Sequence, residues 1–202
     1  MRKSHEERRR EIIQSALDLA TEQGVKQVST QAIADRVGIA QATVFRHFKT
    51  RDEIFAGAIA WIADNMMAVL DSIIGRQLAP DAKLGAIIEQ QLTFIARHRG
   101  LPRLLFSDRL HQESPMLTQA VREVMGRYMR RITGIIREGQ AAGCFDGTLD
   151  AEAAARHVTA SIQGLLMRWS IFDFGFSLEE EARPLRDFLL AALRPGAFSN
   201  QE

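Results

Sequence analysis

Apolar residues recur at helical spacing along almost the whole chain, and this pattern limits the fold more than any other feature. In residues 5–23 the apolar positions fall on one face of a helix: Ile12, Ile13, Ala16, Leu17 and Ala20. The sequence lacks the alternating β-branched runs and hairpin turns that are typical of strands. We therefore predict an all-α protein.

Glycine and proline divide this helical pattern into about nine segments. Gly24 ends the first helix, and a long fourth helix over residues 51–75 precedes the Pro80-Asp81 break. Later helices are predicted at residues 81–98, 101–112, 115–141, 150–173 and 177–194. Pro184 lies inside the last segment, where it removes a backbone hydrogen bond, so we expect a kink or a fresh helix start there.

The distribution of polar and apolar residues predicts two domains. Residues 1–50 form short helices with polar faces, and residues 51–202 form a larger apolar helical bundle. The chain has 26 Lys and Arg residues against 25 Asp and Glu residues, so its net charge of +1 does not indicate a nucleic-acid partner. Positive charge is in excess only locally, in a short basic arm: Arg2, Lys3, Arg8, Arg9 and Arg10, against Glu6 and Glu7.

The cysteine content and the lengths of the apolar runs indicate the cellular compartment of the protein. Cys144 is the single cysteine of the chain, so no internal disulfide can form, which suits a reducing compartment. No uninterrupted apolar stretch reaches the roughly 18 to 20 residues of a membrane span. We expect a cytoplasmic protein with no membrane partner.

Residues 29–48 have the pattern of a helix, a short turn and a second helix. Ser29 or Thr30 can cap the first helix, and Gly38 can adopt the left-handed conformation that ends it. The apolar positions of the motif have the spacing that packs two short helices together: Ile33, Ala34, Val37, Ile39, Val44 and Phe48.

The opposite face of the second helix carries short or hydrogen-bonding side chains: Gln41, Ala42, Thr43, Arg46 and His47. Such groups suit base edges and phosphates in a major groove, which is wide enough to admit a helix. Lys49 and Arg51 follow directly. The same pattern is also compatible with an ordinary helical hairpin that has a solvated polar face.

Residues 9–55 resemble the DNA-binding domain of the TetR (tetracycline repressor) family. The resemblance rests on these positions: Ile12-Ile13, Ala16, Leu19, Gly24, Ile33-Ala34, Val37-Gly38-Ile39, Thr43-Val44-Phe45 and His47-Phe48-Lys49. It implies an N-terminal three-helix DNA-binding domain, a C-terminal helical domain for ligand binding and dimerisation, and repression as the usual outcome. It also implies that the third helix reads DNA and that the last two long helices form the dimer.

The resemblance assigns roles to individual residues. Thr30 and Gln31 should face phosphate or base, and the reading surface should comprise Gln41, Ala42, Thr43, Phe45 and His47. Two positions depart from the family pattern. Phe45 replaces the usual tyrosine and loses a phenolic hydrogen bond to phosphate, whereas Arg51 replaces the usual lysine and keeps its charge.

The expected partners are a palindromic DNA operator, a second copy of the chain and an unidentified apolar or amphipathic effector. A homodimer is expected because one helix-turn-helix makes too small an interface for an operator. The predicted dimer residues are His157, Ser161, Ile162, Leu165, Leu185, Phe188, Leu189 and Ala192. The search region for an effector pocket comprises Trp61, Met66, Met67, Phe94, His98, Leu105, Phe106, Met125, Met129, Trp169 and Phe172, although these residues suit a plain core equally well.

Two alternatives belong to other classes of function. An enzyme is poorly supported, since the sequence has no glycine-rich phosphate loop, no nucleophile elbow and no paired metal-binding histidines, and we expect no cofactor or metal. The second alternative is a DNA-binding or helical interaction protein that is controlled by a protein partner, without a small effector.

Overall fold

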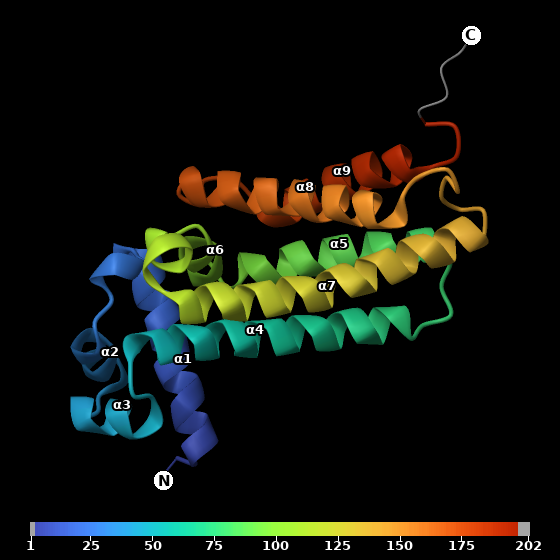
Figure 1. Cartoon of the computed structure of the whole chain (residues 1–202). Coiled ribbons are helices and arrows are strands. Elements are labelled where there is room, and N and C mark those ends of the chain that lie inside the picture. The colour runs from blue at the N-terminus through green and yellow to red at the C-terminus, as the bar shows by residue number, and fades with distance from the viewer. Residues whose placement is uncertain (1–2, 198–202) are drawn as a thin grey trace. The chain divides into compact units, whose positions relative to one another are not determined.

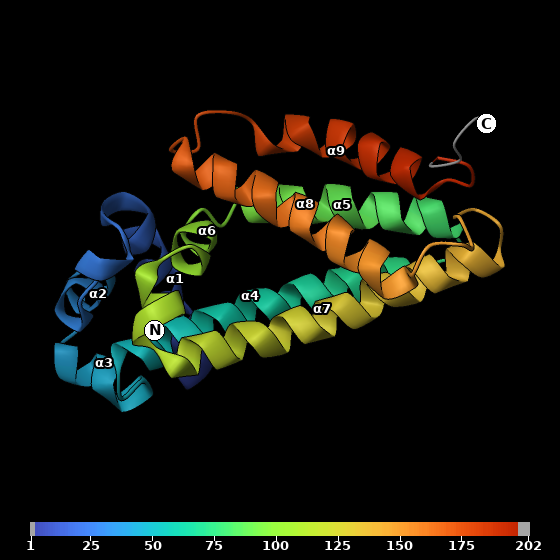
Figure 2. The ribbon, with the colours of Figure 1, turned by 45° about the horizontal axis from the view of Figure 1, so that its top comes forward.

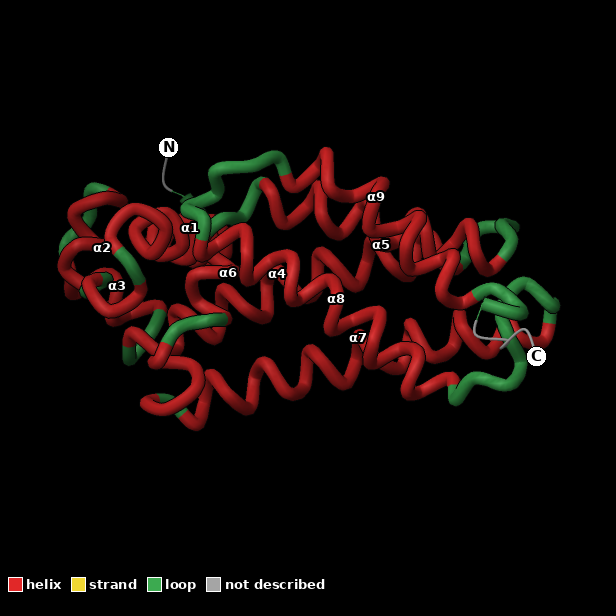
Figure 3. The backbone as a smooth tube through the Cα atoms, turned by 90° about the horizontal axis from the view of Figure 1, so that it is seen from above, coloured by secondary structure: helices red, strands yellow, loops and turns green. Residues whose placement is uncertain are grey.

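The computed structural model describes residues 3–197, and within that range it contains helices and loops but no strand (Figure 1, Figure 3). The α-helices are α1 (His5–Gln23), α2 (Thr30–Val37), α3 (Gln41–His47), α4 (Arg51–Ile74), α5 (Pro80–Ala96), α6 (Gly100–Leu105), α7 (Pro115–Ala141), α8 (Ala151–Ile171) and α9 (Leu178–Leu193). A 3₁₀ turn, η1 (Val25–Gln27), and a π-helical turn, η2 (Arg109–Glu113), complete the set. The all-α prediction is confirmed. Arg2 of the basic arm lies outside the described residues.

The chain forms two compact units. The first comprises Met1–Asp64 and His98–Val124, and the second comprises Asn65–Arg97 and Met125–Glu202. Helices α4 and α7 each begin in the first unit and end in the second. The sequence predicts a boundary between a DNA-binding domain and a ligand-binding domain after residue 50. This functional boundary is a different division from the two compact units, and it stays a prediction.

In the first unit, α1 is the central helix. Its apolar face is buried, with Ile12, Ala16 and Ala20 fully inaccessible to solvent. The first turn of α6 packs directly on its backbone. A Cβ atom at Gly100 would lie 2.3 Å from the carbonyl oxygen of Leu17, so glycine is required for this close approach.

In the second unit, α5 and α9 lie side by side, as the views of Figure 1 and Figure 2 both show. Gly85 of α5 leaves room for the side chain of Arg186, which forms an ion pair with Glu89. The Tyr128 hydroxyl donates to Gln91 Oε1 at 2.6 Å, and burial raises the pKa of this tyrosine. The buried Tyr128 hydroxyl is therefore hydrogen-bonded, as burial of a polar group requires.

One helix prediction is wrong, and one of the two alternatives expected at Pro184, a kink or a fresh start, is excluded. The predicted helix over residues 101–112 is instead α6 followed by η2, because the chain leaves the helical path at Phe106 and Ser107 and resumes as a π-helical turn. The fresh start expected near Pro184 is absent, since α9 runs unbroken from Leu178 to Leu193. Pro184 is exposed, so the helix tolerates the ring on its solvent side.

Helix α4 is long and apolar enough to cross a membrane by length and composition alone. Half of its most apolar window is nevertheless buried inside the structure, as in the core helix of a globular protein. This helix is therefore weak support for a membrane span.

Candidate nucleic-acid interface

The segment from Ser29 to Phe48 folds as two short helices joined by a tight turn. Ser29 caps α2, and its Oγ accepts from the backbone N–H of Ala32 at 3.0 Å. Gly38 ends α2 in the left-handed conformation, with φ 73° and ψ 40°. The following N–H, of Ile39, donates back to the carbonyl of Ala34 at 3.0 Å. The predicted helix, turn and helix are thus confirmed.

The apolar side of this motif is buried as the spacing predicts. Ile33, Ala34 and Val44 are fully buried and Phe48 is 2% exposed, while Val37 and Ile39 are half-buried. These contacts hold α3 with its other side directed outward. The predicted core of the motif is therefore present, and the polar side is available to a partner.

The outward side of α3 presents a mixed surface. Ala42 and Arg46 are exposed, Gln41 and Thr43 are half-exposed, and the ring of Phe45 is 40% exposed. Gln41 Nε2 donates to Thr30 Oγ1 at 2.8 Å, which joins the start of α3 to the start of α2. An exposed aromatic ring among polar groups is suited to contact with sugars and thymine methyl groups.

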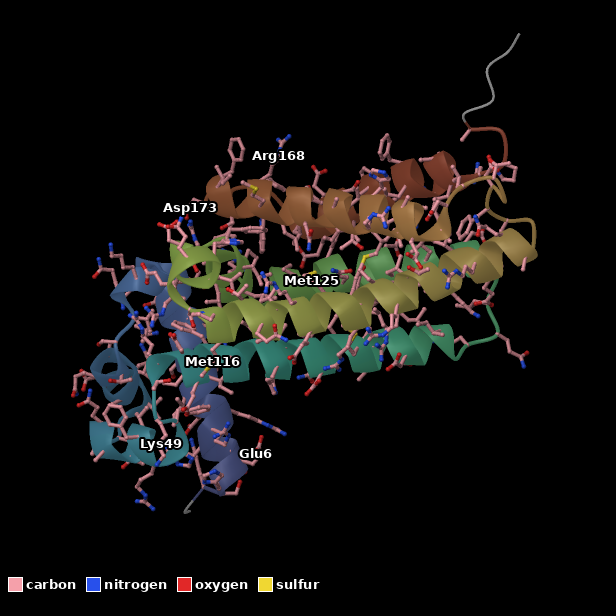
Figure 4. All side chains as sticks on the ribbon, in the orientation of Figure 1. Glu6, Lys49, Met116, Met125, Arg168 and Asp173 are labelled. Atoms are coloured by element: carbon pink, nitrogen blue, oxygen red, sulfur yellow. The ribbon has the colours of Figure 1, made fainter. Side chains whose placement is uncertain are left out.

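The remaining predicted contacts lie at the borders of this surface. Gln31 is exposed and donates to Asp35 Oδ1 at 2.7 Å, one turn along α2. Lys49 is exposed just after α3 (Figure 4), and its backbone N–H donates to Glu53 Oε2 at 2.7 Å. The backbone of Lys49 is therefore fixed next to α3, and its exposed side chain is available to a phosphate.

Arg51 has a structural role besides any contact to phosphate. Its Nη1 donates to the carbonyl of Val28 at 2.7 Å and to that of Lys26 at 3.2 Å, in and just after η1. Burial is the main cause that lowers the pKa of this guanidinium. Arg51 therefore joins the start of α4 to the loop before α2, a role that the sequence did not indicate.

His47 is only half-exposed, although a residue that contacts DNA bases is expected to be open to solvent. Its ring stacks on that of His5 with a centroid separation of 4.4 Å and an interplanar angle of 32°. Its Nδ1 is buried and has no hydrogen-bond partner in the structure. Burial, with the positive charges of His5, Arg9, Arg46 and Arg8, lowers the pKa of His47 below its ordinary value.

Arg9 of α1 holds the end of α3 and was not among the predicted site residues. Its Nη1 donates to the carbonyl oxygen of His47 at 2.6 Å, and its guanidinium carbon lies 4.1 Å from the centre of the Phe48 ring. The sequence showed a basic arm here but could not show that one of its arginines points to a helix 38 residues away. Arg9 and His5 therefore extend the site beyond the helix-turn-helix.

The predicted effector-pocket residues are divided between the two units. Trp61, His98, Leu105 and Phe106 belong to the first, and Met66, Met67, Phe94, Met125, Met129, Trp169 and Phe172 belong to the second. Trp61 meets His98 edge to face at 5.7 Å, and Trp169 is buried, with its Nε1 donating to the Phe176 carbonyl at 2.9 Å. Phe172 is 60% exposed at the end of α8 and Phe106 is 37% exposed after α6, and the assignment of these residues to a pocket stays a prediction.

The predicted dimer residues also divide into two groups. Ile162 and Leu189 are buried inside their own unit, and their assignment to a surface between copies stays a prediction. His157 and Phe188 are exposed, and Ser161, Leu165, Leu185 and Ala192 are half-buried. The outward side of α8 also carries exposed positions that the sequence analysis did not include: Ala160, Gly164, Met167, Arg168 and Ile171.

Taken together, a capped helix, a left-handed glycine turn and a second helix with an outward polar face define a helix-turn-helix DNA-binding protein. Two family models match the chain. Residues 12–58 match bacterial regulatory proteins of the tetR family, and residues 77–170 match the tetracyclin repressor-like C-terminal domain. The chain belongs to the TetR family of transcriptional regulators, which are DNA-binding proteins and not enzymes.

Individual proteins are similar over nearly the full length. The nucleoid occlusion factor SlmA of Klebsiella pneumoniae is 29% identical over 182 residues, which are 90% of this chain and 89% of that protein. The fatty acid degradation regulator FadR of Bacillus halodurans superposes with a TM-score of 0.81 at 21% identity, covering 96% of this chain and all of that one. FadR of Bacillus subtilis, in complex with stearoyl-CoA, gives a TM-score of 0.77 at 22% identity, covering 92% and 99%.

Proposed function

We propose that this regulator binds a palindromic operator as a homodimer, that it acts as a cytoplasmic repressor, and that a small apolar or amphipathic effector releases it. The observation that carries this proposal is the outward face of α3, which the Gly38 turn and the buried Val44 and Phe48 hold in place. A face of this kind, which presents Gln41, Thr43 and Arg46, suits the major groove.

The dimer is proposed from the outward sides of α8 and α9. Exposed large apolar side chains gather on these helices: Met167, Ile171, Phe172 and Phe188 are 47%, 65%, 60% and 68% exposed. Arg168, which Figure 4 shows on the outward side of α8, lies 5.6 Å from the Phe172 ring. Exposed Ala160 and Gly164 on the same helix would allow a second helix to approach closely. Large exposed apolar groups of this kind are typical of an interface between subunits.

Selection of bound duplexes from random DNA tests the main proposal. A palindrome with half-sites about one helical turn apart, or a near multiple, is expected from a two-fold dimer of this motif. Replacing Thr43 with Ala should relax sequence preference, whereas replacing Lys49 with Ala should weaken all sequences alike. Binding that shows neither a preferred sequence nor a dependence on salt would overturn the proposal.

The effector is proposed as an acyl-chain compound, because the FadR structure with stearoyl-CoA shares this fold. Stearoyl-CoA is therefore the first probe. A ligand shifts the DNA-binding equilibrium only if it binds the free and the DNA-bound forms with different affinities. Titration of stearoyl-CoA into a preformed complex with the selected duplex should raise the apparent dissociation constant of the DNA, and an unchanged constant would contradict this part of the proposal.

A second candidate function is DNA binding controlled by a protein partner. The similarity to SlmA, which is named a nucleoid occlusion factor, favours it. A protein of this kind should bind its selected duplex with an affinity that acyl-CoA compounds of several chain lengths leave unchanged. Release by one of these compounds would favour the effector-controlled repressor instead.

A further inference from the structure

The stacked pair of His5 and His47 lies where the first helix meets the last residue of the third. His5 is the first residue of α1 and His47 is the last of α3, and their ring centres are 4.4 Å apart. Arg9, one turn beyond His5, donates to the His47 carbonyl at 2.6 Å and keeps the two helix ends together. Two imidazoles are therefore held in contact at the border of the proposed DNA-reading surface.

The buried Nδ1 of His47 determines which side of the ring can reach a partner. This atom has no hydrogen-bond partner, and a buried N–H without an acceptor is costly. The neutral ring therefore carries its hydrogen on Nε2, the nitrogen at the other end of the imidazole. That N–H is the group through which His47 can donate to a ligand.

The charges around the pair are positive. Arg8 and Arg9 of α1 and Arg46 of α3 act on His47 together with His5. The carboxylates of the same stretch of α1 have partners of their own: Glu6 lies 3.8 Å from Arg10, Glu7 accepts from the Ser4 N–H, and Glu11 pairs with Lys3 and with Arg8, whose charge it partly offsets. Without DNA, a proton added to His47 meets these positive charges and also places a buried N–H without an acceptor.

A phosphate at this position would offset these positive charges and accept from the His47 Nε2–H, so the pair can hold an added proton there without placing it on the buried Nδ1. We propose that His5 and His47 form a proton-linked site for a DNA backbone phosphate, in which the histidine pair takes up a proton from solvent when the duplex binds. This proposal rests on the proposed DNA-binding function. It adds His5, on a helix outside the helix-turn-helix, as a contact to the operator.

Operator affinity should consequently rise as the pH falls. A site that takes up one proton changes a dissociation constant by at most about tenfold per pH unit. We expect the wild-type dimer to bind its selected duplex about 3- to 10-fold more tightly at about pH 6.5 than at about pH 7.5. Ionic strength is held constant in fluorescence-anisotropy titrations, because phosphate contacts also depend on salt.

Histidine variants distinguish a pH dependence of DNA binding that comes from the His5–His47 pair from a general response of the protein to pH. His5→Asn should reduce the change to less than about 2-fold, and His47→Gln should reduce it as well while weakening binding at every pH. His111→Gln, which alters a histidine of η2 whose Nε2 lies 2.9 Å from the Leu105 carbonyl oxygen, should keep the wild-type response. Circular dichroism and sedimentation of each variant confirm that fold and oligomeric state are preserved.

Calorimetry gives a second readout that does not depend on affinity. In buffers of different ionisation enthalpy, wild-type binding near neutral pH should show net proton uptake, and His5→Asn should show less. Equal proton uptake and equal pH profiles for the wild type and His5→Asn would overturn the proposal. Absence of duplex binding at every pH would instead contradict the proposed function. Inorganic phosphate that competes at millimolar concentration in the wild type, but not in His5→Asn, would support the same site.

Discussion

Gly100 and Leu17 are in direct backbone contact: a Cβ at Gly100 would lie 2.3 Å from the Leu17 carbonyl oxygen and 2.8 Å from the carbonyl carbon. No side chain can move to relieve such a clash, because both atoms belong to the backbone of α1. Packing of α6 on α1 within the first unit therefore depends on a residue without a side chain.

Gly100→Ala should destabilise the protein by about 1–3 kcal/mol, the usual cost of forcing extra volume into a packed site. Urea denaturation followed by circular dichroism measures the effect. Gly134→Ala is the matched control, because Gly134 is exposed in α7 and a Cβ there would have nothing within 4 Å. That control should gain about 0.5–1 kcal/mol from helix propensity, and equal effects at the two glycines would contradict the packing argument.

Phe45→Tyr should strengthen operator binding. The ring is 40% exposed on the outward side of α3, so a hydroxyl group would extend into solvent in the free protein without a loss of packing. One added hydrogen bond to phosphate corresponds to about a 2- to 12-fold lower dissociation constant. Anisotropy titration with the selected duplex measures the change. An affinity equal to that of the wild type would show that position 45 does not face the DNA backbone.

Replacing Arg51 with Ala should mainly reduce stability, whereas replacing Lys49 with Ala should mainly weaken DNA binding. Arg51→Ala deletes the hydrogen bonds to the Lys26 and Val28 carbonyls and should lower the free energy of unfolding by about 1–2 kcal/mol. Lys49→Ala removes an exposed ammonium group and should change stability by less than about 0.5 kcal/mol. It should also reduce the salt slope of DNA binding by about 0.9 for each phosphate lost. Chemical denaturation and salt titration of both variants test this division, which fails if Arg51→Ala is as stable as the wild type.

Phe188→Glu should convert the dimer to monomers. Its ring is 68% exposed on α9, and a carboxylate there would be desolvated against a second copy. Analytical ultracentrifugation measures the mass, and circular dichroism should show unchanged helix content. Leu78→Glu is the control, since Leu78 is 40% exposed in the loop between α4 and α5. Loss of dimers in the control, or their persistence in Phe188→Glu, would place the interface elsewhere.

Asp150→Ala should lower the melting temperature at about pH 7 and have little effect in strong acid. Asp150 caps α8, and hydrogen bonds from the Ala153 and Glu152 backbone N–H groups lower the pKa of its carboxyl group. The folded-state pKa is below the unfolded value of about 3.9. The stabilisation is therefore present above that pH and is lost as the pH falls through the folded-state pKa. A series of thermal melts from about pH 7 down to about pH 1 tests this, and a difference that stays constant through the whole series would contradict it.

The sequence predicted the elements whose signals are local. Helical spacing indicated the all-α fold, and Gly38 with the apolar positions around it indicated the helix-turn-helix. The sequence did not predict the break between α6 and η2, because no glycine or proline stands at residues 106–108 to mark it. Contacts between distant segments, such as Arg9 with His47 or Arg51 with Val28, leave no periodic pattern in the sequence and became visible only in the folded chain.

The burial of Ile162 and Leu189 inside their own unit has a consequence for how operator occupancy depends on the concentration of the regulator. These two side chains are buried without a partner subunit, and a dimer that assembles from folded subunits forms in an equilibrium that depends on protein concentration. Below the dimer dissociation constant, operator occupancy then increases with the square of protein concentration. A twofold change in synthesis would alter occupancy about fourfold in that range, which gives the promoter a threshold before any effector is bound.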